Sequence, residues 1–155
     1  MKFSDRSLER LVIHCTATER GRDVTSDEIR HWHTDPKPKG RGWSKIGYSD
    51  MIHLDGTIEN LTPYNSDDIV DDWEITYGAS GFNATSRHVV YVGGLLNGKS
   101  WDTRTPQQSL TLKFYAKLFL LNHPGRDIVG HNKLNNKKDC PCFDVEAWRA
   151  NNQIF

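Results

Sequence analysis

An excess of charge of either sign is missing from this sequence. Its 20 lysines and arginines balance its 20 aspartates and glutamates. Without a net charge, the protein as a whole would not be drawn to nucleic acid or to an anionic membrane. We therefore expect neither as a partner, and we look for function in a local site.

Long apolar runs are also missing. None approaches the roughly 20 residues that are needed to cross a bilayer. The N-terminal stretch MKFSDRSLER has no apolar core of the kind found in secretory signals. We therefore expect synthesis in the cytoplasm without a signal peptide.

Cysteine is scarce, with three residues in the whole chain. An odd count does not fit a disulfide scaffold, and Cys140 and Cys142 are too close in sequence for a relaxed disulfide with each other. Reduced thiols that are available to a metal ion are the expected state.

The length of 155 residues, 36% of them hydrophobic, suits one domain with a real core over residues 1–155. Predicted strands alternate with predicted helices along the chain. The expected fold is therefore α/β, with a mixed central sheet of about five strands flanked by helices. We expect a monomer.

Strands are predicted where apolar or β-branched runs end at turn residues. These runs are Arg10–Cys15, the paired segments Ile46–Leu54 and Thr57–Asn60, Arg87–Val92 and Asp127–Gly130. Asp55-Gly56 between the paired segments predicts a hairpin with a type I′ turn, which needs positive φ at both central positions. In this hairpin, Tyr48 would share a face with Asp50 and Ile52.

Helices are predicted where capping residues precede apolar periodicity. Thr25 and Glu28 form a capping-box pattern before a helix at about Ser26 to Thr34. Thr105-Pro106-Gln107-Gln108 starts a second helix that runs to about Asn122, and Asp144 caps a last one that runs to about Asn151. The predicted buried stripe of the second helix is Leu110, Phe114, Leu118 and Leu121.

Two histidines lie at the carboxyl ends of predicted strands. His14 ends the first strand, and His131 follows the strand at Asp127–Gly130. Ligands gather at the carboxyl ends of strands in α/β sheets, so these imidazoles can meet. Cys140 lies nine residues after His131 in GHNKLNNKKDCPCFD, and Cys142 offers a second thiol. The spacing suits a metal site.

Structural roles compete with this interpretation. A lone histidine at a strand end is more often a hydrogen-bonded core residue, and the two cysteines can be idle. His31 and His33 point in different directions on one helix, so we interpret both as structural. His88, on the strand at Arg87–Val92, is predicted to be a core or sheet-face residue rather than a ligand.

Five motifs in one order resemble a known family. They are HCTAT from His14, W-x-x-I-G-Y-S from Trp43 to Ser49 with DGTI after it, FNATSRHVVYVGG from Phe82 to Gly94, the TPQQ helix start, and GH…KKDCPCFD. From about Leu11 to Trp148 the chain resembles the zinc-dependent N-acetylmuramoyl-L-alanine amidases, which include amidase-type phage lysozymes and are similar to peptidoglycan recognition proteins.

The resemblance implies a function. The expected reaction is hydrolysis of the amide between N-acetylmuramic acid and L-alanine in peptidoglycan, which lyses the cell wall. The expected cofactor is one zinc ion per chain. A phage or prophage endolysin that acts on the wall after release would fit these features. A non-catalytic peptidoglycan-binding module is the alternative.

The resemblance also implies site residues. The zinc ligands of the family match His14, His131 and Cys140, its catalytic tyrosine matches Tyr48, and its lysine two residues before the cysteine ligand matches Lys138. Two imidazoles and one thiolate leave an open fourth position on zinc, as in catalytic sites. Tyr48 and Lys138 would then stabilise the oxyanion formed by attack on the amide.

Three positions depart from the family pattern. Ser49 stands where the family often has histidine after the tyrosine, and Gly78 stands where a histidine is frequent. Cys142 replaces a small residue, so either thiol could bind the metal, with Cys140 preferred. The first two changes affect substrate contacts or rate rather than the ligands.

Overall fold

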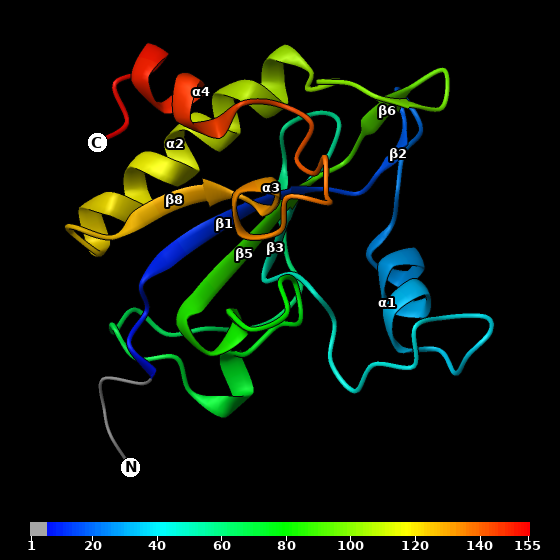
Figure 1. Ribbon diagram of the computed structural model, residues 1–155, viewed down its shortest axis with the longest axis horizontal. Coiled ribbons are helices and arrows are strands. Elements are labelled where there is room, and N and C mark those ends of the chain that lie inside the picture. The colour runs from blue at the N-terminus through cyan, green and yellow to red at the C-terminus, as the bar shows by residue number, and fades with distance from the viewer. Residues whose placement is uncertain (1–5) are drawn as a thin grey trace.

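A five-stranded mixed sheet lies at the centre of the computed structural model, which describes residues 6–155 (Figure 1). The strand order is β4-β3-β5-β1-β8. Its members are β1 (Arg10–Cys15), β3 (Asp50–Ile52), β4 (Ile58–Asn60), β5 (Ser86–Tyr91) and β8 (Asp127–Gly130). β3 and β4 pair antiparallel, and the other neighbouring pairs are parallel. The predicted α/β fold with a mixed sheet is confirmed.

A smaller sheet of three strands, which the sequence pattern did not predict, continues from the carboxyl ends of β1 and β5. It contains β2 (Thr18–Glu19), β6 (Gly94–Leu96) and β7 (Lys99–Ser100), in the order β2-β6-β7. Strands of two or three residues are too short to show a period.

Four α-helices flank the sheets, and all but the third lie at the boundaries that the capping residues predicted. They are α1 (Ser26–Thr34), α2 (Pro106–Asn122), α3 (His131–Leu134) and α4 (Val145–Asn151), and two 3₁₀ turns, η2 (Asp72–Glu74) and η3 (Asn83–Thr85), lie in the long central loop. Both predicted capping boxes form, and the Asp144 side chain accepts a hydrogen bond from the Ala147 N–H. The four-residue helix α3 was not predicted.

The predicted buried face of α2 is wrong. Leu110, Phe114, Leu118 and Leu121 are 57%, 61%, 56% and 75% exposed, whereas Gln108, Leu112, Ala116 and Phe119 are buried. The helix has apolar residues on two faces, so helical periodicity alone does not say which face meets the sheet. Gln108 fixes the choice, because its buried amide donates hydrogen bonds to the carbonyl oxygens of Ile52 and Val92.

The hairpin is present, but its turn is not type I′. Gly56 has a φ of +85°, and Asp55 is not among the residues with positive φ. The Gly56 N–H donates to the His53 carbonyl at 2.9 Å, and the Asp55 side chain accepts from the Thr57 N–H. One left-handed glycine after a tight turn therefore closes the hairpin, a common alternative to the two-residue loop.

The two faces of the central sheet have separate apolar clusters. Ile13, Ile52 and Val89 pack with Leu112 of α2 on one face, whereas Met51 and Val90 pack with Ile29 of α1 on the other. Tyr48 precedes β3 and packs with the α1-side cluster. The prediction that Tyr48 shares a face with Ile52 is therefore wrong.

None of the helices within residues 6–155 is long and apolar enough to cross a membrane. Residues 1–5, which begin the stretch used for the expectation about a secretion signal, lie outside the described part of the chain.

Candidate metal centre

Three elements bring His14, His131 and Cys140 together. His14 lies near the end of β1, and His131 begins α3 directly after β8. These strands are parallel neighbours in which Ile13 pairs with Gly130, so the residue after each partner is a histidine. Cys140 comes from the turn that follows α3. The potential ligand atoms of the three side chains lie within 4.8 Å of one another.

A hydrogen-bond chain sets the tautomer of His14. The Asn83 Oδ1 accepts from the Ala79 N–H at 2.9 Å and contacts His88 Nε2 at 3.0 Å, so His88 Nε2 carries the proton. His88 Nδ1 is then an acceptor, and it lies 2.8 Å from His14 Nε2. His14 Nε2 is therefore the donor, which leaves a lone pair on His14 Nδ1. That atom is 3.7 Å from Cys140 Sγ.

Burial keeps these imidazoles neutral. It is the main cause that lowers the pKa of His14 well below its usual value, with the nearby His88 and His131 adding to the effect. Burial likewise lowers the pKa of His88 to about 3. The pKa of His131 is lowered by burial and by the Lys138 ammonium. Neutral histidines are the form that binds metals.

Gly78 makes room for this chain. A Cβ at Gly78 would lie 2.4 Å from His88 Nδ1 and 2.8 Å from the Gly47 carbonyl oxygen, so no other residue fits without movement. The departure from the family pattern at Gly78 is thus matched by a buried histidine, His88, which fills the space beside it. His88 lies on the sheet face as predicted, but its hydrogen bond to His14 was not foreseen.

The thiol of Cys140 faces the histidines, whereas that of Cys142 does not. Cys140 Sγ accepts a hydrogen bond from the Cys15 N–H at 3.2 Å and lies beside His14. Cys142 is not a member of the potential ligand group, and its Sγ lies 3.7 Å from Cys15 Sγ. Of the two thiols in the Cys-Pro-Cys segment, Cys140 has the geometry of a ligand.

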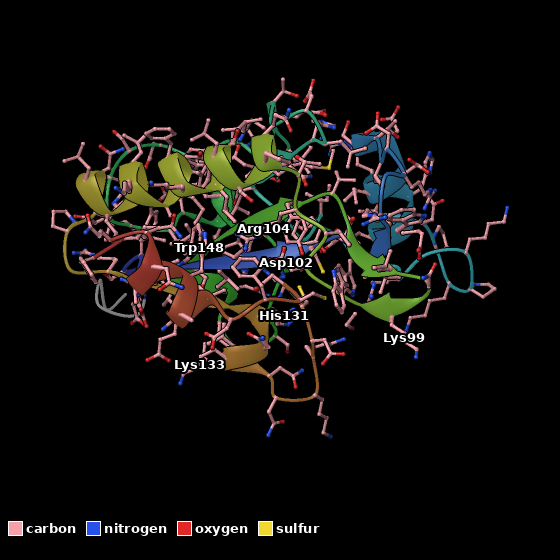
Figure 2. The ribbon with its side chains drawn as sticks, turned by 90° about the horizontal axis from the view of Figure 1, so that it is seen from above. Lys99, Asp102, Arg104, His131, Lys133 and Trp148 are labelled. Carbon is pink, nitrogen blue, oxygen red and sulfur yellow. The ribbon has the colours of Figure 1, made fainter. Side chains whose placement is uncertain are left out.

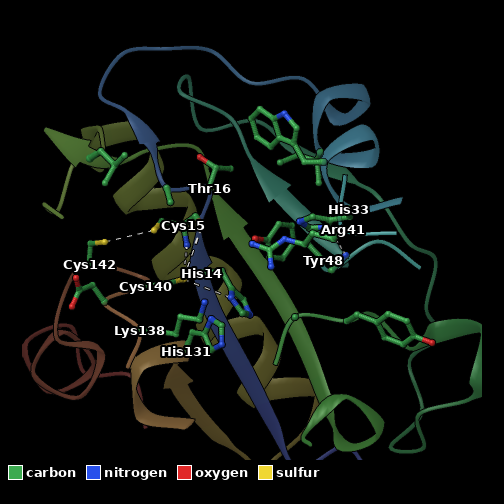
Figure 3. A pocket seen from close by; sticks show the side chains of 18 of the residues that line it. His14, Cys15, Thr16, His33, Arg41, Tyr48, His131, Lys138, Cys140 and Cys142 are labelled. Atoms are coloured by element: carbon green, nitrogen blue, oxygen red, sulfur yellow. Dashed lines mark hydrogen bonds between the residues drawn. The ribbon is translucent and has the colours of Figure 1, made fainter. Parts of the chain in front are cut away.

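The three side chains lie at one side of a pocket of roughly 450 Å³. Figure 3 shows Lys138 beside His131, and Tyr48, His33 and Arg41 across from them. The ring centroids of Tyr48 and His14 are 5.2 Å apart. Burial raises the pKa of Tyr48, so the phenol keeps its proton at neutral pH. Both predicted catalytic side chains therefore line the same pocket as the three potential ligands.

His33 supports the segment that carries Tyr48. Its Nδ1 accepts a hydrogen bond from the Gly47 N–H at 2.9 Å, and a Cβ at Gly47 would lie 2.9 Å from the His33 ring. The interpretation of His33 as structural fits this contact, and the residue also lines the pocket. His31 is exposed and pairs with Asp35.

A second cluster, of Asp67, Asp71 and Glu74, also has oxygens within 4.8 Å of one another. Its buried member, Glu74, accepts hydrogen bonds from the backbone N–H groups of Asn65 and Asp71. These bonds give Glu74 a role in shaping the loop without any ion.

An anchor fixes the chain just beyond the cysteines. The Arg104 guanidinium lies 3.6 Å from the centre of the Phe143 ring and 5.6 Å from that of Trp148, and it pairs with Asp102. Figure 2 shows Arg104, Asp102 and Trp148 close to one another, with α3 and His131 on the side of the sheet away from α2. This packing holds the Cys-Pro-Cys segment at the end of β1.

No protein-family model matches the chain. The endolysin of Escherichia phage T7 is 30% identical over 156 aligned residues, which cover 99% of this chain and 94% of the relative. Among solved structures, the N-acetylmuramoyl-L-alanine amidase LysC from Clostridium intestinale is similar, with a TM-score of 0.73 at 24% identity over 97% of this chain and 89% of that one. Manduca sexta peptidoglycan recognition protein 1 has a TM-score of 0.62 at 21% identity, covering 88% and 73%. The two structures share the fold.

Proposed function

Because the chain belongs to the family of phage endolysins, we propose that it is a zinc amidase that cleaves the bond between N-acetylmuramic acid and L-alanine in bacterial peptidoglycan. The observation that carries this proposal is the convergence of His14, His131 and Cys140 beside Tyr48 in one pocket. The choice of bond is supported by the similar fold of LysC, which is named as an N-acetylmuramoyl-L-alanine amidase.

The donor set fits zinc. Two neutral imidazoles and a thiolate are ligands that zinc prefers, and three protein ligands leave a position free for water or substrate. His14 Nε2 is used in the hydrogen bond to His88, so the lone pair on His14 Nδ1 is left for a metal ion and lies beside Cys140. We assign His14, His131 and Cys140 as the ligands. Zinc bound there would supply a hydroxide at neutral pH and would polarise the substrate carbonyl.

Two side chains of the pocket then act on the scissile amide. Tyr48 keeps its proton at neutral pH and donates a hydrogen bond to the carbonyl oxygen as charge develops on it. The Lys138 ammonium, on the opposite wall, adds a positive charge beside the same oxygen. One carboxylate, Asp139, also lines the pocket, and its Oδ2 accepts a hydrogen bond from the Ser100 hydroxyl.

The place of action follows from the substrate. Peptidoglycan lies outside the cytoplasm, so the protein acts on the wall, in the periplasm or outside the cell, after its release from the cytoplasm. One chain supplies every residue assigned to the site, and we propose that the active form is a monomer.

Mass spectrometry of purified peptidoglycan after digestion tests the function. We expect new L-alanine amino termini that disappear with a chelator and return with added zinc. Cys140→Ser should abolish them, whereas the matched variant Cys142→Ser, assayed with reductant, should retain them. Binding to an intact wall without new amino termini would instead identify a non-catalytic binding module.

A further inference from the structure

Two of the three cysteines lie together beside the metal centre. Cys15 ends β1 and is 4% exposed, and its Sγ is 3.7 Å from the Sγ of Cys142. Figure 3 shows this contact on the side of β1 away from Tyr48. The third thiol, Cys140, lies beside His14. The contact therefore joins two thiols that the proposed zinc site does not use.

The backbone holds Cys142 in a costly conformation. Its φ of +68° lies in the left-handed region, which residues with a Cβ rarely adopt. The Cys142 N–H donates to the Asp139 carbonyl at 2.7 Å, so the turn is closed. Glycine would adopt this conformation without strain. What a cysteine adds at this position is a thiol next to that of Cys15.

The neighbours of both thiols limit their movement. The Tyr91 hydroxyl donates to the Pro141 carbonyl at 2.6 Å, and Arg104 stacks on Phe143, so the residues on either side of Cys142 are anchored. A Cβ at Gly94 would lie 2.5 Å from Cys15 Sγ. The sulfur of Cys15 therefore lies close against Gly94 and cannot move in that direction. A disulfide needs the sulfurs to approach by about 1.6 Å, to a bond length of about 2.05 Å.

We propose that Cys15 and Cys142 form a disulfide in an oxidising environment, while Cys140 stays reduced as a zinc ligand. The expectation that the disulfide forms in the compartment of the cell wall rests on the proposed function, but the cross-link itself does not.

The oxidant is a disulfide, either a small molecule such as oxidised glutathione or an exchange-active protein disulfide. The partly exposed Cys142 attacks it as a thiolate, forms a mixed disulfide and expels one thiol. Cys15 then attacks the Cys142 sulfur and expels the second thiol. The two cysteines lose two protons and two electrons, and the oxidant gains them as two thiols.

The cross-link would join the strand that carries His14 to the turn that carries Cys140. It would close a loop of most of the chain, and such loops gain the most from cross-linking in the chain-entropy model. We expect the midpoint of thermal unfolding to rise on the order of 10 °C on oxidation. Cys142→Ser should remove this rise without changing the midpoint of the reduced protein by more than a degree or two.

Thiol counting on the zinc-loaded full chain tests the proposal. The protein is equilibrated in glutathione buffers from reducing to oxidising and quenched in acid. It is then denatured with chelator and excess N-ethylmaleimide at mildly acidic pH, where this reagent still alkylates thiols while exchange is slow, and weighed intact. Of the three thiols, we expect one to be alkylated after oxidation, and proteolysis should yield a Cys15–Cys142 peptide pair. Cys140→Ser should still form the pair, and Cys142→Ser should keep Cys15 free.

Alkylation of all three cysteines in the most oxidising buffer would overturn the proposal. A Cys15–Cys140 pair, or dimers linked through Cys142, would also overturn it. Because the readout is mass rather than wall digestion, failure of the cross-link and failure of the amidase activity are seen separately.

Discussion

The two faces of the central sheet come from the same strands but carry different chemistry. In β1, Ile13 points to the apolar cluster under α2, and the next residue, His14, points to the pocket. In β5, Val89 joins the cluster under α2, whereas His88 bonds to His14. Alternation along a strand thus lets one segment build the core and present a ligand. In β1 and β5, the polar residues inside the apolar runs, His14 and His88, lie on the same face as the pocket.

Removing the thiolate from the polar face gives the largest expected effect. Cys140→Ser should bring peptidoglycan cleavage down to the level of chelator-treated protein, because two histidines alone hold zinc weakly. Zinc content after gel filtration and cleavage rate are the measurements. Retention of stoichiometric zinc by this variant would exclude Cys140 as a ligand.

Tyr48→Phe should lower the cleavage rate by about 10²–10³-fold, the usual cost of one donor to a developing oxyanion. Zinc content and the thermal midpoint should change little, because the ring and its packing remain. Rate and zinc content measured on the same sample check this. A rate within a factor of about three of wild type would contradict a role for the hydroxyl.

The apolar face is tested by two leucines of α2. Leu112→Ala should lower the free energy of unfolding by about 2–5 kcal/mol, because it leaves a cavity under the helix. Leu118→Ala, on the exposed stripe of the same helix, should cost no more than about 0.5 kcal/mol. Urea denaturation compares them. Equal costs would mean that the stripe is covered in solution.

The histidines should make stability depend on pH. His88 has a pKa of about 3 in the folded state and about 6.5 when unfolded. Below pH 6.5 the unfolded chain binds the proton and the folded one does not, so stability falls as the pH drops from 6.5 toward 3. The slope is about 1.4 kcal/mol per pH unit for each such histidine. Denaturation of metal-free protein should show a shallower slope for His88→Gln than for wild type.

The smallest effect is expected at Asn83, which acts on His14 only through His88. Asn83→Ala should weaken zinc binding by about 10-fold, the lower end of the range for partners of ligating histidines. Competition with a chromogenic chelator measures the affinity. Asn97→Ala, in an exposed turn, is the control, and an equal affinity for both variants would remove Asn83 from the account.

Local signals predicted the parts of the fold that depend on short stretches of chain. Thr25 with Glu28 and Thr105 with Gln108 start their helices as expected, since a capping box needs only neighbouring residues. His14 and His131 come together because both follow strands whose parallel pairing places their ends side by side. The resemblance, rather than spacing alone, assigned Tyr48 and Lys138, and their catalytic roles stay predictions.

The features that the sequence did not predict depend on contacts between distant segments. The apolar residues on both faces of α2 leave its orientation open until Gln108 meets the carbonyls of Ile52 and Val92. The link from Asn83 through His88 to His14 depends on strand pairing and on the space left by Gly78. Likewise, no spacing rule relates Cys15 to Cys142, because their contact joins opposite ends of the chain.

X-ray absorption at the zinc edge of the zinc-loaded protein tests the central claim most directly. The account predicts one sulfur at about 2.3 Å and two imidazole nitrogens at about 2.0–2.1 Å, with a further light atom completing the shell. Two sulfurs would show that a second cysteine binds the ion, and a shell without sulfur would remove Cys140 from the site. Either result would contradict the assignment of His14, His131 and Cys140 as the zinc ligands.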